Sequence, residues 1–196
     1  MMKIIRPLYN WTMDKAEHKN ALWFLAFISF IESSIFPIPP DILLIPMILA
    51  RPNKAWLYAT VCTISSVIGG IAGYAIGYFL YDIIGQPVLD LYGYGDKFSS
   101  FQTRYNEWGA WIVLMAGVTP FPYKIITIAS GVTQLNFAVF CLSSIVARGL
   151  RFFIIAGLLW KFGAPIRQFI DKYLGPLTVL GFILLIGGFV VAKYML

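Results

Sequence analysis

Two long apolar stretches of this chain are each interrupted by a cluster of prolines. The first, residues 21–50, contains Pro37, Pro39 and Pro40, and the second, residues 109–131, contains Pro120 and Pro122. Proline lacks a backbone N–H and clashes with the preceding turn, so a regular helix breaks there. Residues 21–36 are fewer than the roughly 20 residues that a helix needs to cross a bilayer. Such broken backbone is tolerated at membrane depth only where protein or water surrounds it.

The rest of the chain is equally apolar, which favours an all-α integral membrane protein. Hydrophobic residues make up 59% and charged residues 12% of the sequence, against about 25% charged residues in soluble domains. Uninterrupted apolar stretches predict spanning helices over residues 55–81, 136–162 and 176–196. Residues 1–20 predict an amphipathic surface helix, with a disordered tail as the alternative for the first few residues. Residues 82–108 form a polar connection in which 98–108 are expected to be a short surface helix.

The two broken stretches open two units of similar order, residues 21–87 and 109–165. Pro37 and Pro120 lie 83 residues apart, as do Pro39 and Pro122, and the Ser65-Ser66 pair recurs as Ser143-Ser144 at an offset of 78. Interrupted helices at equivalent places of two repeats indicate a transporter site near the bilayer midplane. We therefore predict two inverted repeats within a core of residues 21–175. In each repeat the broken segment is a re-entrant hairpin followed by one span.

A single kinked span in each repeat is the alternative to a hairpin. Lysines and arginines at segment ends divide nine to three between the two sides in either topology, so both satisfy the rule that positive loops face the cytoplasm. The same scattered placement explains the net charge of +6 by anionic lipid and predicts no nucleic-acid partner. One histidine and two separated cysteines predict no metal site, no cofactor and no enzymatic activity.

Five ionisable residues lie inside the apolar stretches: Glu32, Asp41, Lys124, Arg148 and Arg151. Each costs at least about 2.5–3.5 kcal/mol at the centre of a bilayer, so we expect them to be paired or in contact with water. Salt bridges that only hold the fold together are the structural alternative. If the five residues do not serve only as such salt bridges, charged groups at that depth indicate a path for a solute or a proton.

The positions of these residues on the broken helices suggest their roles. Glu32 is near the C-terminal, negative end of a half-helix, where the ionised form is disfavoured, so we expect it to carry a proton. Asp41 follows two prolines at the start of the next half-helix, where it is stabilised as an anion that can cap free N–H groups or pair with an arginine. Lys124 occupies the place equivalent to Asp41. Arg148 and Arg151, three residues apart, share one helix face, and with Lys124 they form a predicted phosphate pocket.

The residues from Glu32 to Asp41, Glu-Ser-Ser-Ile-Phe-Pro-Ile-Pro-Pro-Asp, resemble the first hairpin of the DedA family, also called the VTT or SNARE-associated Golgi protein family. The residues from Gly117 to Gly131 resemble its second hairpin, and Thr-Pro-Phe-Pro-Tyr-Lys with the later Arg-Gly-Leu-Arg-Phe is similar to the YqaA-like branch. The resemblance implies two re-entrant hairpins and lipid transport or scrambling, with undecaprenyl phosphate recycling proposed for bacterial members. It also implies coupling to ion or proton gradients. Many members carry arginines at the positions of Gly117 and Tyr123, so the positive charge here is shifted to Lys124 and the two arginines.

These observations predict a proton-coupled transporter or flippase of a phosphorylated lipid in the bacterial cytoplasmic membrane. Its partners are membrane lipids with an anionic phosphate headgroup, and protons. The proton-coupling residues are Glu32 and Asp41, and the substrate-binding residues are Tyr123, Lys124, Arg148 and Arg151. A proton-coupled small-ion or drug antiporter and a non-transporting membrane scaffold are the alternatives. The glycines at 69, 73 and 77 predict close helix packing within one chain and leave homo-oligomer formation open.

Overall fold

The computed structural model describes residues 20–35, 39–92, 95–119, 121–163 and 165, and in these residues the fold is all helical. The elements in order are α2 (Ala21–Ser34), α3 (Asp41–Ala50), η1 (Pro52–Lys54), α4 (Ala55–Leu80), the π-helical turn η2 (Tyr81–Gly85), α5 (Gln86–Tyr92), α6 (Gly95–Val118), α7 (Tyr123–Val132) and α8 (Phe137–Phe162). The all-α prediction is confirmed for these residues. The predicted surface helix 1–20, except for Asn20, and the predicted span 176–196 lie outside them.

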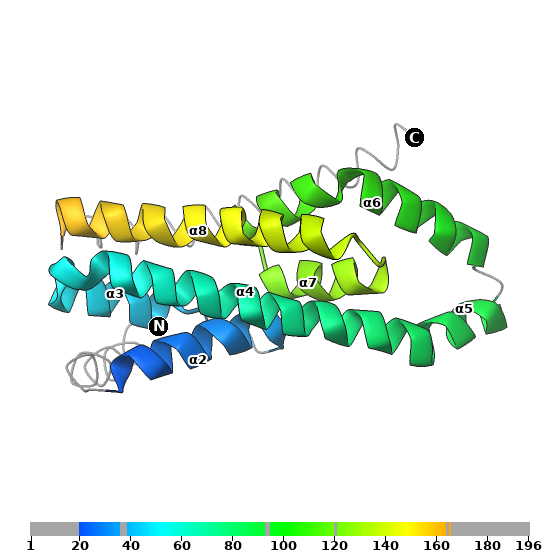
Figure 1. Ribbon diagram of the computed structural model, residues 1–196, viewed down its shortest axis with the longest axis horizontal. Helices are drawn as coiled ribbons and strands as arrows, with labels where there is room; N and C mark the ends of the chain where they lie inside the picture. The colour runs from blue at the N-terminus through cyan, green and yellow to red at the C-terminus, as the bar shows by residue number, and fades with distance from the viewer. Residues whose placement is uncertain (1–19, 36–38, 93–94, 120, 164, 166–196) are drawn as a thin grey trace.

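Helices α4 and α8 form the frame of the molecule. They lie side by side and run in opposite directions along its long axis (Figure 1). Each has 26 residues and is therefore about 39 Å long, enough to cross a hydrocarbon layer of about 30 Å. Helix α8 begins where the side chain of Asn136 accepts hydrogen bonds from two backbone N–H groups of the first turn, and it ends at Gly163, whose φ is +60°. Both predicted spans are confirmed as helices.

Two pairs of shorter helices pack against this frame from opposite ends of the molecule. The pair α2 and α3 occupies one half, and α6 and α7 occupy the other, with the interruptions of both pairs near the middle (Figure 1). We call residues 35–40 the first break and residues 119–122 the second break. Pro40 immediately precedes α3 and Pro122 immediately precedes α7, as predicted, whereas Pro37 and Pro120 lie outside the described residues. Each pair thus starts and ends at the same end of the molecule, and an origin by duplication stays a prediction.

Helix α6 differs from the prediction for residues 98–108. The structure has one continuous helix from Gly95 to Val118, in place of a short surface helix followed by a separate apolar segment. The reason is that polarity changes along residues 95–118 but no proline interrupts them, so backbone hydrogen bonding continues through the change. Gly109, at the boundary we predicted, allows Leu135 to pack directly against the helix backbone.

The glycine stripe of α4 is covered by the same chain. A Cβ atom at Gly69 would overlap the backbone of Phe30 on α2, and one at Gly77 would overlap the backbone of Ile128 on α7. Helices α2 and α7 therefore approach α4 at backbone contact distance, which requires glycine. The predicted role of this stripe in packing within one chain is confirmed.

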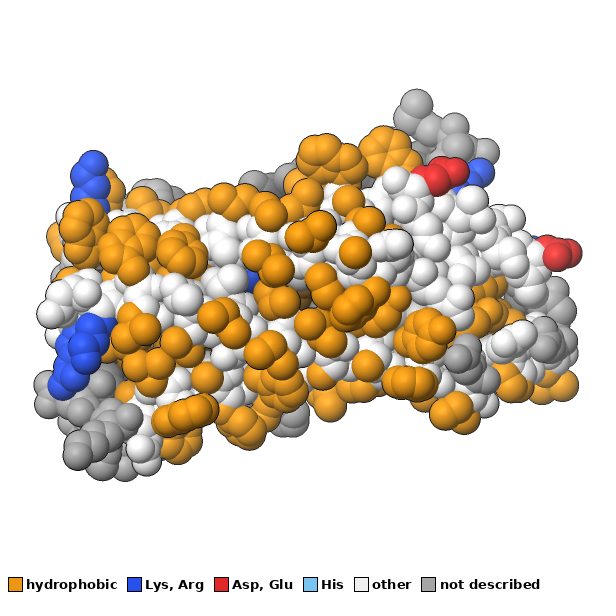
Figure 2. Space-filling model, viewed as in Figure 1, with side chains coloured by type: hydrophobic (Ala, Val, Ile, Leu, Met, Phe, Trp, Pro, Cys, Tyr) orange, Lys and Arg blue, Asp and Glu red, His pale blue; other side chains and the backbone are white. Residues whose placement is uncertain are grey.

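The outer surface of the frame is apolar, while polar side chains are inside. Figure 2 shows hydrophobic side chains along the length of the molecule, with charged ones mainly at its two ends and a small basic patch near the middle. Helices 52–80 and 137–162 are long and apolar enough to cross a membrane, and less than half of an apolar 18-residue segment in each is buried. Their exposed side chains include Leu57, Ile64, Ile68, Phe79, Leu142, Ile145, Val146, Leu150 and Ile154. The buried hydroxyl groups include those of Ser29, Ser33, Ser66, Thr127, Ser130 and Ser144. An apolar outside and a polar inside suit a protein surrounded by lipid.

Candidate functional site

The five ionisable residues singled out in the sequence lie around the two breaks, and four of them form two ion pairs. Nη2 of Arg148 is 2.8 Å from Oε2 of Glu32, and Nη2 of Arg151 is 2.6 Å from Oδ2 of Asp41. Glu32 is near the end of α2 and Asp41 is the first residue of α3, while both arginines come from the middle of α8. The predicted pairing of buried acids with bases is confirmed. We call Glu32, Asp41, Lys124, Arg148 and Arg151 the central cluster.

Arg148 is buried and contacts an acid, a hydroxyl group and two aromatic rings. Its side chain is 3% exposed, and Nε donates a hydrogen bond to Oγ of Ser66 on α4, at 2.5 Å. The guanidinium carbon lies 4.9 Å from the ring centre of Tyr123 on α7 and 4.7 Å from that of Phe152, distances at which a cation is attracted to an aromatic ring. Together with Glu32, these contacts connect Arg148 to three other helices.

A set of buried hydroxyl groups surrounds this arginine, and we did not predict their roles. Oγ of Ser33 lies 2.6 Å from Oγ of Ser66 and donates to Oε2 of Glu32 at 3.1 Å. The hydroxyl of Tyr123 donates to Oγ of Ser144 at 2.5 Å. The one sequence signal was the recurrence of Ser65-Ser66 as Ser143-Ser144, since Ser66 and Ser144 are the members that make these contacts. Buried hydroxyls in hydrogen bonds stabilise a charged group away from water.

Arg151 connects the two breaks. Its Nη2 donates to Asp41 at the start of α3, and its Nη1 donates to the carbonyl oxygen of Thr119 at 3.2 Å, where α6 ends. Asp41 does not cap α3, because Pro40 holds the N-cap position and the carboxylate faces Arg151 instead. Its second oxygen, Oδ1, is buried and has no hydrogen-bond partner among the described residues. The predicted pairing of Asp41 with an arginine is confirmed, whereas the structure shows no capping by this side chain.

Lys124 also connects the second break to the first. It is the second residue of α7, and its Nζ donates to the carbonyl oxygen of Ile35, just beyond the end of α2, at 3.2 Å. Within the described part of the chain, no carboxylate forms an ion pair with Lys124. The ammonium group therefore has one hydrogen bond to a neutral carbonyl and two further donors. Of the three cations, it is the one without a carboxylate partner in the described residues.

The charges of the central cluster do not cancel. Two carboxylates face two guanidinium groups, and the ammonium of Lys124 leaves one positive charge when all five are ionised. A site of this composition can bind an anion, and guanidinium groups match the oxygens of a phosphate. The sequence argument for a neutral Glu32 considered the helix end and burial, and the structure adds the guanidinium group of Arg148, whose Nη2 lies 2.8 Å from Oε2 of Glu32. The role of Glu32 in proton coupling stays a prediction. The described residues contain no group of three metal-ligating side chains.

Comparison with known proteins gives the family of this chain. Its residues 38–161 match the sequence model of the VTT domain. An uncharacterised protein of Haemophilus influenzae is 40% identical over 174 residues, which are 87% of this chain and 90% of the relative. An uncharacterised homologue from Histophilus somni is 42% identical over 174 residues, 87% of this chain and 91% of the relative. No solved structure matches. With the matched domain covering α4, all but the last residue of α8, the second break, the end of the first break and four of the five residues of the central cluster, the chain belongs to the VTT-domain, or DedA, family of membrane proteins.

Proposed function

We propose that this protein is a transporter or flippase that moves a phosphorylated lipid across the bacterial cytoplasmic membrane, coupled to protons. The substrate is an undecaprenyl-phosphate-like carrier or a phospholipid. The observation that supports this proposal best is the central cluster itself: three cations and two acids gathered between two interrupted helix pairs. The family is one of membrane proteins thought to be transporters or flippases, not enzymes, which supports the same class of function.

The cost of placing charges at that depth supports a functional role for the cluster. A buried ion pair often stabilises a protein no better than apolar side chains of similar volume, so holding the fold together does not require one. Two such pairs and an additional lysine beside two breaks in regular backbone form an expensive arrangement. Interrupted helices with free N–H groups beside cations are suited to an anion that enters and leaves.

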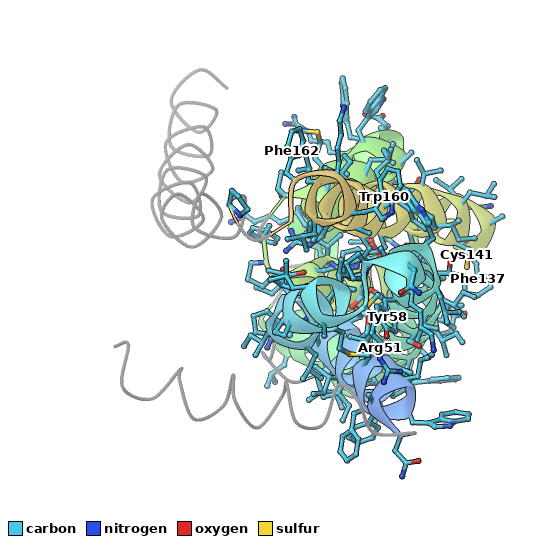
Figure 3. All side chains as sticks on the ribbon, turned by 90° about the vertical axis from the view of Figure 1, so that its left-hand side faces the viewer. Arg51, Tyr58, Phe137, Cys141, Trp160 and Phe162 are labelled. Atoms are coloured by element: carbon cyan, nitrogen blue, oxygen red, sulfur yellow. The ribbon has the colours of Figure 1, made fainter. Side chains whose placement is uncertain are left out.

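The charged ends of the molecule indicate its orientation. Arg51, Lys54 and Lys161 lie at one end, which we call the basic end, and Figure 3 views the molecule from there. The opposite end carries Asp96, Lys97, Arg104 and Glu107 on α6. Positive residues gather on the cytoplasmic side of membrane proteins, so we assign the basic end to the cytoplasm. Both ends of the α2 and α3 pair are then cytoplasmic, and the first break lies inside the membrane.

A proton-coupled antiporter of a small ion or drug is the second candidate. The complete pairing of Arg148, which has Glu32, Ser66 and two aromatic rings as partners, favours a structural role for this arginine. In an antiporter the acids would serve the coupling ion and neither arginine would bind substrate. A scaffold without transport differs from both, because neither a lipid nor a pH gradient would change its state.

The experiment that tests the proposal is reconstitution of the purified protein in liposomes that contain a labelled lipid phosphate. We expect the label to move between leaflets faster when a pH gradient is applied, and we expect Arg151→Ala to lose this movement. Arg104→Ala, an exposed arginine on α6, is the control and should move lipid at the wild-type rate. Movement of lipid by Arg151→Ala at the wild-type rate would count against a phosphate site, and movement of a small cation in its place would favour the antiporter.

A further inference from the structure

We propose that the carboxylate of Asp41 occupies the position on Arg151 that the phosphate of the substrate takes when it binds. A phosphate that enters replaces Asp41, which then takes up one proton, while Glu32 remains bound to Arg148. This inference rests on the proposed function and separates the roles of two acids that the sequence treats alike. It starts from a difference between the two ion pairs in how firmly their surroundings hold them.

The pair of Arg148 and Glu32 is held firmly. Arg148 also donates to Ser66 and lies between two aromatic rings, and Oε2 of Glu32 accepts a second hydrogen bond from Ser33. If Glu32 left, the contacts of Arg148 with Ser66 and the two rings would hold its charge in place without a carboxylate, with only 3% of the side chain exposed. Removing one member of such a pair costs about 3–5 kcal/mol. This pair is therefore a fixed part of the framework.

The pair of Arg151 and Asp41 has fewer restraints. The Arg151 side chain is 16% exposed, and its other hydrogen bonds go to the backbone carbonyls of Thr119 and Val118 at the second break. A guanidinium group has five N–H donors, so Arg151 can keep these carbonyls and still exchange its carboxylate partner. A phosphate offers the same kind of charged oxygen acceptors as a carboxylate, and Arg151 can accept it in place of Asp41.

Asp41 has no second hydrogen-bond partner among the described residues that could replace Arg151 when Arg151 binds a phosphate. Its side chain is 10% exposed, and Oδ1 already lacks a hydrogen-bond partner among the described residues. Arg148 on α8, which is paired with Glu32 on α2, and the thiol of Cys62 on α4 also interact electrostatically with Asp41. A buried carboxylate left without a partner takes up a proton instead of remaining charged.

The exchange conserves charge in the central cluster. Before it, Asp41 and Arg151 cancel. After it, the phosphate faces Arg151, one proton from solution has formed an O–H bond on Asp41, and no other covalent bond has changed. A second negative charge on the phosphate, if it carries one, is matched by Lys124, whose Nζ contacts the first break at Ile35. The cluster therefore accepts an anion without leaving any carboxylate unpaired.

The test measures proton uptake on phosphate binding by the full-length protein in micelles. Phosphatidylglycerol is the lipid probe, because its diester does not titrate near neutral pH, and inorganic phosphate is the soluble probe. A pH-indicator dye in weak buffer reports protons, and tryptophan fluorescence reports affinity. We expect wild type to take up one more proton per bound phosphatidylglycerol than Asp41→Asn. A bound state with one extra proton is favoured at low pH. As pH rises, the affinity of wild type for phosphatidylglycerol should therefore fall about tenfold per pH unit relative to that of Asp41→Asn.

The outcomes separate this inference from the proposed function. Glu32→Gln should keep the additional proton of wild type, and loss of that proton in Glu32→Gln but not in Asp41→Asn would overturn the assignment. Should Asp41→Asn fail to fold, wild type alone decides: binding of phosphatidylglycerol without proton uptake refutes the inference and leaves the phosphate site intact. Failure of wild type to bind either probe refutes the proposed function as well. If phosphatidylglycerol binds and inorganic phosphate does not, the site recognises a lipid headgroup. If inorganic phosphate binds, the site recognises free phosphate. Either result supports the exchange when the additional proton is present.

Discussion

Replacing Gly69 with alanine should move α2 away from α4 and weaken the central cluster from a distance. A Cβ atom at this position would lie 2.9 Å from both Cα and the carbonyl carbon of Phe30, and closer still to its oxygen. Carbon atoms in contact prefer about 3.5–4.0 Å, so α2 must shift by about 1 Å. Glu32 and Ser33 follow Phe30 within one turn of α2, and they would move with it.

The expected magnitude follows from these contacts. Inserting a methyl group into packed helices costs about 1–3 kcal/mol, and the better helix propensity of alanine returns up to about 1 kcal/mol. A shift of about 1 Å lengthens the hydrogen bonds of Glu32 with Arg148 and of Ser33 with Ser66, 2.8 and 2.6 Å at present, beyond hydrogen-bond distance. Losing a hydrogen bond to a charged group costs about 1.5–3 kcal/mol. We therefore expect a net loss of about 2 kcal/mol or more.

The assay is the free energy of unfolding in mixed detergent micelles, measured as SDS is added. The matched control is Gly149→Ala in α8, where the nearest atom to an added Cβ, on Thr63, is 3.9 Å away. This change should be neutral or stabilise the protein by up to about 1 kcal/mol. The two alanines should thus have opposite signs. A Gly69→Ala protein as stable as wild type would refute the close approach of α2 to α4.

Three further predictions concern the ion pair, the start of α8 and the orientation. Arg148→Met should lower the free energy of unfolding by about 3–5 kcal/mol because Glu32 is left buried without its partner; Glu32→Gln in the same protein should recover at least half, and no recovery would contradict a paired role. Asn136→Ala should cost about 1 kcal/mol by removing the cap of α8, seen as a lower thermal midpoint; an unchanged midpoint would show that the cap contributes nothing. With the native cysteines replaced by alanine, a cysteine at Asn53 should react with an impermeant maleimide from the cytoplasmic side only, and one at Ser99 from the outer side only. The reverse labelling would invert our orientation.

The ends of most helices could be predicted because they depend on local chemistry. Pro40 and Pro122 precede α3 and α7 because proline ends hydrogen bonding in the preceding segment but fits the first turn of the next helix. The prediction was wrong for α6, where a change in polarity at Gly109 was read as a boundary. Polarity decides which solvent a helix faces, whereas only the backbone hydrogen bonds decide whether it continues.

The pairing within the central cluster could not be predicted in the same way. The sequence shows that Arg148 and Arg151 share a face, about 4.5 Å apart along α8, but either could reach either acid. The choice depends on where α8 passes the first break, which is a property of the packed structure. The serines carried a weaker signal still, since single hydroxyls are common in apolar helices, and only the repeated serine pair distinguished Ser66 and Ser144.

The remaining positive charge of the central cluster links its stability to its function. With both acids ionised, each arginine is neutralised at 2.8 Å or less, so the two pairs can exist at mid-depth without a ligand. Lys124 donates to the carbonyl oxygen of Ile35 and stays the one cation of the cluster that no carboxylate of the described residues pairs with. Exchange at Arg151 would let a phosphate meet this charge while Asp41 becomes neutral, so that the empty and the occupied site both avoid an unpaired buried carboxylate. A transporter needs this balance, because a site that strongly prefers one state does not complete a cycle.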